Sequence, residues 1–74
     1  MEARIEQTWL VAALRNTQFY LKSDREIISN AMTGVEDTST EYELANNRIY
    51  CEACVVIANL DEIIERIDKT LNNK

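Results

Sequence analysis

Residues 49–71 read IYCEACVVIANLDEIIERIDKTL, and this stretch decides the fold. Its apolar side chains recur at intervals of three and four residues, which is the spacing of one face of an α-helix. Polar side chains such as Glu52, Asn59 and Glu62 fall on the flanks or on the far side of that helix. The pattern therefore predicts one long amphipathic helix. Its apolar positions are Ile49, Tyr50, Ala53, Val56, Ile57, Leu60, Ile63, Ile64, Ile67 and Leu71.

The start of this helix is marked by two candidate capping boxes. Thr40 precedes Glu43 by three residues, and Thr38 precedes Glu41 by the same spacing. In such a box the threonine and the acid each accept a hydrogen bond from the other's backbone N–H. Together with the apolar pattern, these signals predict a helix over 39–72.

The first half of the chain is predicted to be helical over about 2–32. Gly34 follows as the only glycine, and we expect it to end the helix in a left-handed conformation. Polar side chains such as Gln18 and Arg25 are placed on the far side of this helix. The predicted apolar face consists of Leu10, Ala13, Leu14, Thr17, Tyr20, Leu21, Asp24, Ile27, Ile28 and Ala31.

A third capping box, Ser23-Asp24-Arg25-Glu26, lies inside this first helix. It could break the helix near Ser23 and give three helices in all. Against that, the apolar pattern stays in phase from Leu14 through Leu21 to Ile28. The phase favours one continuous helix, and the broken form remains the alternative.

Two helices joined by about half a dozen residues pack as an antiparallel hairpin. The chain has 74 residues, no proline and one glycine, which favours few, long elements in one all-α domain over 1–74. If Thr33 pairs with Thr40, facing residue numbers add to about 74.

Both predicted helices also carry apolar residues away from their main faces, and a lone hairpin would leave these exposed. Covering them against a second copy, as a homodimeric four-helix bundle, is the simplest arrangement. A different protein partner is the alternative, with Trp9 and Phe19 as anchors. The predicted partner or dimer interface consists of Ile5, Trp9, Ala12, Phe19, Cys51, Val55 and Ala58.

The formal net charge is −5, and all of the excess lies between Arg25 and Arg48, where five acids occur without a base. Four of these acids form a predicted acidic patch: Glu36, Asp37, Glu41 and Glu43. Such a patch repels nucleic acid and anionic membranes and suits a basic protein partner. Its simpler interpretation is a solvated loop. The absence of a signal pattern and of a bilayer-length apolar stretch predicts a cytoplasmic protein.

The chain offers little catalytic chemistry. Cys51 and Cys54 form a C-x-x-C motif, but it lies within a helix and follows no strand, unlike thioredoxin-type redox sites. Two reduced, packed cysteines are the favoured interpretation, and a four-cysteine zinc site across a dimer is the alternative. With no histidine and no glycine-rich loop, we expect no enzyme activity and no cofactor.

Asp24 is the one acid within the predicted apolar face of the first helix. Its simpler role is to cap a helix break or to pair with Arg48. The alternative is a small-ligand pocket formed by Tyr20, Asp24, Arg48 and Tyr50, because aromatic walls with a few polar groups are typical of ligand sites.

These features predict a small acidic interaction protein that binds a protein partner and modulates it, most simply by inhibition. Phages and other mobile elements make small helical inhibitors of this kind. The alternative is a helical module that binds a small ligand or a metal.

Overall fold

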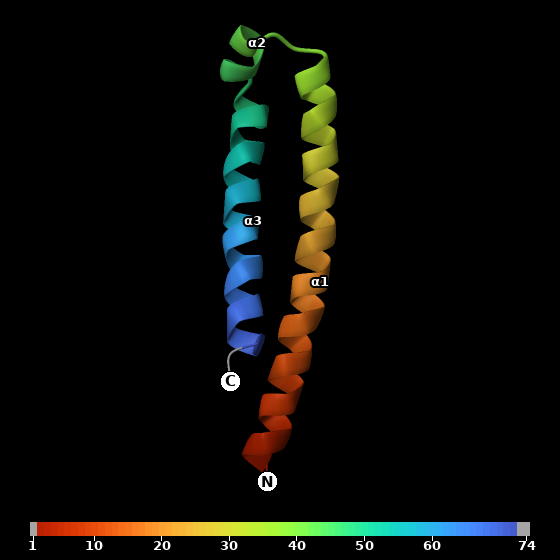
Figure 1. The fold of residues 1–74 in the computed structure, drawn as a ribbon, viewed down its shortest axis with the longest axis vertical. Helices are drawn as coiled ribbons and strands as arrows, with labels where there is room; N and C mark the ends of the chain where they lie inside the picture. Colours follow the sequence, from red (N-terminus) through yellow and green to blue (C-terminus); the bar gives the residue numbers. More distant parts are fainter. Residues whose placement is uncertain (1, 73–74) are drawn as a thin grey trace.

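The computed structural model describes residues 2–72, with side chains described over 7–72, and its secondary structure is entirely helical. Helix α1 spans Glu2–Asp37, the short helix α2 spans Glu41–Ala45, and α3 spans Arg48–Asn72. Helices α1 and α3 run antiparallel along a rod of 58 × 18 × 16 Å, with α2 at the closed end (Figure 1). The predicted all-α hairpin is therefore confirmed.

Helix α1 passes through both positions at which the sequence suggested an interruption. It continues across Ser23, so the capping box there does not break it. It also continues across Gly34, which has no positive φ, so the prediction of a left-handed helix end at Gly34 is wrong. The helix ends at Asp37, where the Thr38 hydroxyl donates to the carbonyl of Gly34 at 3.1 Å. This bond uses a carbonyl that the helix end would otherwise leave unpaired.

The predicted second helix is divided in two. Thr40 caps α2, and its reciprocal bonds with Glu43, 3.1 and 2.9 Å long, confirm that capping box. Helix α2 ends at Ala45, and α3 begins two residues after Asn46, at Arg48. The Asn47 side chain accepts a hydrogen bond from the Tyr50 N–H at 3.0 Å, which is the geometry of an N-cap. The asparagine pair therefore restarts the helix that the sequence predicted as continuous from 39.

The two long helices meet along one line of half-buried side chains spaced alternately three and four residues apart, which we call the seam. This is the heptad spacing of helices that pack side by side. On α1 the seam consists of Val11, Leu14, Gln18, Leu21, Arg25, Ile28, Met32 and Val35. On α3 it consists of Tyr50, Ala53, Ile57, Leu60, Ile64, Ile67 and Leu71. Only Ile67 among the described side chains is fully buried, at 8% exposure.

The seam differs from the face predicted for the first helix. Gln18 and Arg25, predicted to point away, lie half-buried in it. Both find partners on α3: the Gln18 amide donates to the Ile64 carbonyl at 3.2 Å, and Arg25 pairs with Asp61. These hydrogen bonds allow polar side chains to occupy a row that is otherwise apolar.

Three pairs of side chains that bond one another across α1 and α3 fix the register of the hairpin. Glu36 bonds Tyr50, Arg25 bonds Asp61 and Gln18 bonds Asp68, and in each pair the residue numbers add to 86. The predicted sum of about 74 is wrong because α1 is longer and α2 is inserted before α3. In this register the end of α3 lies level with Leu14, so the first turns of α1 project beyond α3 (Figure 1).

Candidate interaction surfaces

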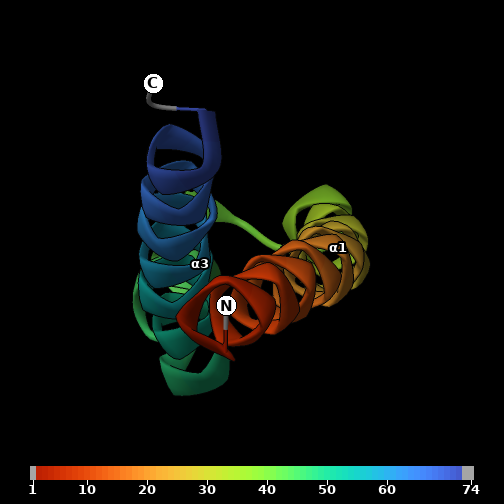
Figure 2. The same cartoon turned by 90° about the horizontal axis from the view of Figure 1, so that it is seen from below.

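The hairpin is a single layer, with α1 and α3 side by side and, within residues 2–72, no third long helix over either side (Figure 2). Its accessible surface is 6262 Å². A compact folded chain of the same mass would expose about 4,700 Å². Within residues 2–72 no helix is long and apolar enough to cross a membrane. The hairpin exposes roughly 1,600 Å² more surface than a compact chain of its mass.

Six large hydrophobic side chains gather on one side of the hairpin, which we call the exposed apolar face. On both helices these residues lie one position before a seam residue. In antiparallel helices the positions before the seam lie on a shared side, as do the positions after it. The six residues and their exposed fractions are Leu10 60%, Tyr20 58%, Ile27 64%, Ile49 83%, Val56 41% and Ile63 44%.

Near the closed end, this face contains a groove of about 250 Å³ whose walls are largely apolar. Ile27 and Ala31 line it from α1, and Ile49 lines it from α3, with Met32 and Tyr50 of the seam at its floor. The groove places residues of both rows around one space. It thereby supports the assignment of the two rows to one side of the molecule.

The opposite side of the hairpin, which follows the seam residues, is more polar. Asp61 and Asp68 lie there and accept the hydrogen bonds of Arg25 and Gln18. Four residues of the predicted interface also lie on this side, and all are exposed: Ala12, Phe19, Cys51 and Ala58. Trp9 and Val55 point further outward, with exposed fractions of 68% and 53%. Ile5 belongs to α1, but its side chain lies outside the described residues.

The register separates this predicted interface into two parts. The sequence-based register placed Phe19 near Val55, whereas the observed register places Phe19 level with Ile67. Trp9, Ala12 and Phe19 therefore lie towards the open end, and Cys51, Val55 and Ala58 lie towards the closed end. The structure does not bring the two groups together as one surface.

The acidic patch lies at the closed end, across the end of α1 and the short helix α2. All four acids are exposed, but two of them have local structural roles. Glu43 completes the cap of α2, and Glu36 accepts a hydrogen bond from the Tyr50 hydroxyl. Asp37 and Glu41 remain fully available to a partner.

Three of the four residues proposed for a ligand pocket make no hydrogen bond or ion pair with one another. Asp24 and Arg48 are exposed, and Tyr20 stacks edge-on against Phe19 with ring centres 5.5 Å apart. Tyr50 bonds Glu36 instead, and this bond raises the pKa of Tyr50 to about 12. Over residues 7–72, no hydrogen bond or ion pair joins any two members of this group.

Both cysteines are free and exposed. The Cys51 thiol is within 3.7 Å of the Leu44 carbonyl, so it packs against α2 as a weak donor. Within the described part of the chain, no three cysteines or carboxylates lie together in a group that could hold a metal ion. A zinc site would therefore need ligands from a second copy.

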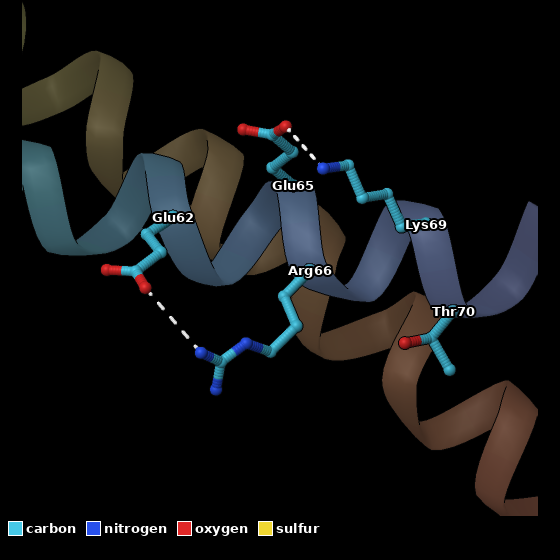
Figure 3. Close-up of a pocket in the computed structure, with 5 residues that line it drawn as sticks. All are labelled: Glu62, Glu65, Arg66, Lys69 and Thr70. Carbon is cyan, nitrogen blue, oxygen red and sulfur yellow. Dashed lines mark ion pairs between the residues drawn. The ribbon is translucent and has the colours of Figure 1, made fainter.

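A further hollow runs along the outer side of α3 and is drawn in Figure 3. It is lined by Glu62, Glu65, Arg66, Lys69 and Thr70, all from one helix. Its four charges neutralise one another in two pairs spaced four residues apart, Arg66 with Glu62 and Lys69 with Glu65. Such exposed pairs are typical of a solvated helix surface.

Comparison of the chain with protein-family models, with curated proteins and with solved structures yields no match in any of the three.

Proposed function

We propose that this chain is a small, non-catalytic interaction protein that binds a protein partner and modulates it, most simply by occluding a functional surface. The observation that carries the proposal is that far more hydrophobic side chains are exposed than buried. Among the side chains described over 7–72, ten large hydrophobic ones are substantially exposed and one hydrophobic side chain is buried. Contiguous exposed apolar surface of this kind marks interaction sites in soluble proteins.

The partner surface in this proposal centres on Trp9 and Phe19. Their exposed fractions are 68% and 67%, and tryptophan is among the residues that contribute most to binding energy at interfaces. Both lie in the half of α1 towards the open end, away from the row that faces α3. A partner that covers them buries aromatic area without disturbing the seam.

The acidic patch supplies the second part of this proposal, a preference for a basic partner. Asp37 and Glu41 are exposed at the closed end of the rod, far from Trp9 at the other end. Complementary charge at such a distance increases the association rate more than it increases the lifetime of the complex. The aromatic residues then determine how slowly the partner dissociates.

We also propose that two copies pair as a four-helix bundle. The excess surface of two hairpins is about 3,100 Å², which lies within the range of roughly 2,000–5,000 Å² buried by permanent homodimers. Each helix also presents two adjacent apolar rows. Two rows are the width typical of bundle helices, whereas a two-stranded coiled coil needs one.

The test of partner binding begins with capture of partners from cells that make the protein, followed by affinity measurements with the purified partner. Trp9→Ala is expected to weaken binding by about thirtyfold or more, chiefly through faster dissociation. Glu41→Ala, the comparison variant, is expected to lower the association rate and its salt dependence while changing dissociation little.

Equal, negligible effects of the two substitutions on a purified partner would overturn the proposed partner surface. Circular dichroism of each variant shows whether the hairpin is intact. Both positions are exposed and helical, so neither change is expected to unfold it.

A further inference from the structure

The exposed apolar face has no partner within residues 7–72 of the hairpin. Its row on α1 runs Leu10, Ala13, Thr17, Tyr20, Asp24, Ile27 and Ala31. Its row on α3 runs Ile49, Glu52, Val56, Asn59, Ile63, Arg66 and Thr70. The α1 row is mostly apolar and contains one charge, Asp24. In the α3 row three apolar residues alternate with polar ones, and its two charges are Glu52 and Arg66. The pairing of these charges constrains what can cover the face.

We propose that a second copy of this chain covers the exposed apolar face, with α1 of each copy packed against α3 of the other. This rests on the dimer proposed above and assigns it a face and an orientation. The sequence had placed self-pairing on the side of Phe19 and Ala58. That side is interrupted by the bonded pairs Arg25–Asp61 and Gln18–Asp68, which a dry interface would have to cover.

The orientation follows from Asp24, the acid within the α1 row. Its carboxylate is exposed, and no ion pair involves it over residues 7–72. Covering an unpaired charge is costly, so a bundle that places a base opposite Asp24 is favoured. If α1 packed on α1 of the other copy, Asp24 would face a row that contains no base. Glu52, the acid of the α3 row, is exposed near the closed end and has to stay in contact with solvent.

If α1 packs on α3 of the other copy, the closed ends lie together and the axial levels of the hairpin are preserved. Asp24 is level with Glu62 in the observed register, because paired residue numbers add to 86. Arg66 lies one helical turn further along the same α3, about 6 Å away. An arginine side chain spans that distance, so Arg66, which pairs with Glu62 at 3.5 Å in the single hairpin, can turn to Asp24 of the other copy.

The same axial levels place apolar residues of the two copies opposite one another across the interface. Ile27 is level with Asn59 and therefore falls between Val56 and Ile63 of the other copy, which lie one turn to either side. Tyr20 is level with Arg66 and adjacent to Ile63. The arrangement also places the two acidic patches at one end of the bundle, where eight carboxylates face the solvent and any basic partner.

The face is tested by the solution mass of matched charged variants. The wild-type chain is expected at twice 8.6 kDa by light scattering and by native mass spectrometry. Ile27→Lys is expected to weaken the dimer by at least about tenfold, because it covers a charge in the interface. Phe19→Lys, at a residue of nearly equal exposure on the other side, is expected to leave the dimer intact.

Ile63→Lys provides an independent probe of the same face on α3, and circular dichroism verifies that each variant remains helical. A wild-type chain that stays monomeric at millimolar concentration would overturn the proposal. The proposal would also be overturned if Phe19→Lys abolished the dimer while Ile27→Lys left it intact.

The orientation is tested by mixing two charge-reversal variants, Asp24→Arg and Arg66→Asp. In the homodimer of either variant, residue 24 of one copy and residue 66 of the other carry like charges. In a mixed dimer these two positions carry opposite charges at both contacts. The mixed species is therefore expected to exceed half of all dimers in native mass spectrometry, which resolves the two variants by mass. A random half would refute the α1-to-α3 orientation.

These readouts are independent of the partner experiment. A monomeric chain whose partner binding still depends on Trp9 would overturn the dimer alone. A dimer whose partner binding is indifferent to Trp9 would overturn the partner surface alone.

Discussion

The phenolic hydroxyl of Tyr50 donates a hydrogen bond to the carboxylate of Glu36, which joins the first turn of α3 to the last turn of α1. The negative acceptor favours the protonated phenol, and desolvation acts in the same direction. Together they raise the pKa of Tyr50 from 10.0 to about 12. The hydrogen bond is therefore a pH-sensitive link at the closed end of the hairpin.

Because the folded pKa is the higher one, this link stabilises the fold fully below about pH 10 and is lost as the pH rises through about 12. We expect Tyr50→Phe to lower the free energy of unfolding in neutral solution, and we expect that difference to shrink across this window. Urea unfolding of both proteins at several pH values measures it.

An ultraviolet titration of tyrosinate provides the control for this assignment. The chain has three tyrosines, and Tyr50→Phe is expected to remove a titration step near pH 12. If the substitution removes an earlier step instead, the hydrogen bond to Glu36 does not persist in solution.

Gly34 occupies the interior of α1, where its backbone freedom serves no turn. Its φ is not positive, and a Cβ atom built there meets nothing within 4 Å. Gly34→Ala is therefore expected to raise the free energy of unfolding by about 0.5–1 kcal/mol, because alanine is the better helix former. Chemical denaturation followed by circular dichroism measures this change.

Gly34→Asn distinguishes the two possible roles of this position. Asparagine tolerates a left-handed helix end, so it would exceed alanine in stability if the helix stopped at Gly34. Within a helix the order is reversed, and we expect the alanine variant to be the more stable of the two.

Ile67 is the best-buried side chain of the seam, with 8% exposure. Ile67→Ala is expected to lower the free energy of unfolding by about 2 kcal/mol, at the low end for core truncations because the surrounding seam is only half-buried. Val55→Ala, at a residue with 53% exposure on the outer side of α3, is expected to change it by less than about 0.5 kcal/mol. Equal losses from the two variants in urea titrations would contradict this placement of the core.

The sequence predicted the helices well because their apolar spacing is regular over many turns. The face of α1 that packs against α3 was predicted less well. That helix has two adjacent apolar rows, and the spacing of apolar residues does not distinguish one row from the other. Which row meets α3 depends on tertiary bonds: Gln18 and Arg25 can occupy the seam only because Ile64, Asp68 and Asp61 receive their donors. No local pattern contains that information.

The connection between α1 and α3 was predicted less well than the helices themselves, for a different physical reason. Gly34 is typical of a helix end, but the helix bonds on either side of it override that preference. Asn46 and Asn47 carried the signal that was missed, since asparagine is among the strongest N-cap residues. The error in register follows from these two misplaced ends, and it also explains why Phe19 and Val55 were expected to meet.

The candidate surfaces were predictable in part. Trp9 and Phe19 were expected to be exposed because they fall outside the main pattern, and they are. Leu10, Tyr20, Ile27, Ile49, Val56 and Ile63 were assigned to the hairpin core because each lies in an apolar row. A pair of helices covers only one row on each, so exposure of the second row becomes visible only once the register is known.

The short connection around α2 also sets the order in which the hairpin can form. The bonded pair nearest the turn, Glu36 and Tyr50, closes a span of 14 residues, whereas Arg25 with Asp61 closes 36 and Gln18 with Asp68 closes 50. The entropy lost in closing a chain increases with its length, so contacts near the turn are the least costly to form first. Each contact then shortens the free segment left for the next.

The contacts between α1 and α3 are therefore expected to form in order, from the closed end towards the open end. Substitutions at Glu36 or Tyr50 would slow refolding, whereas substitutions at Gln18 or Ile67 would mainly accelerate unfolding.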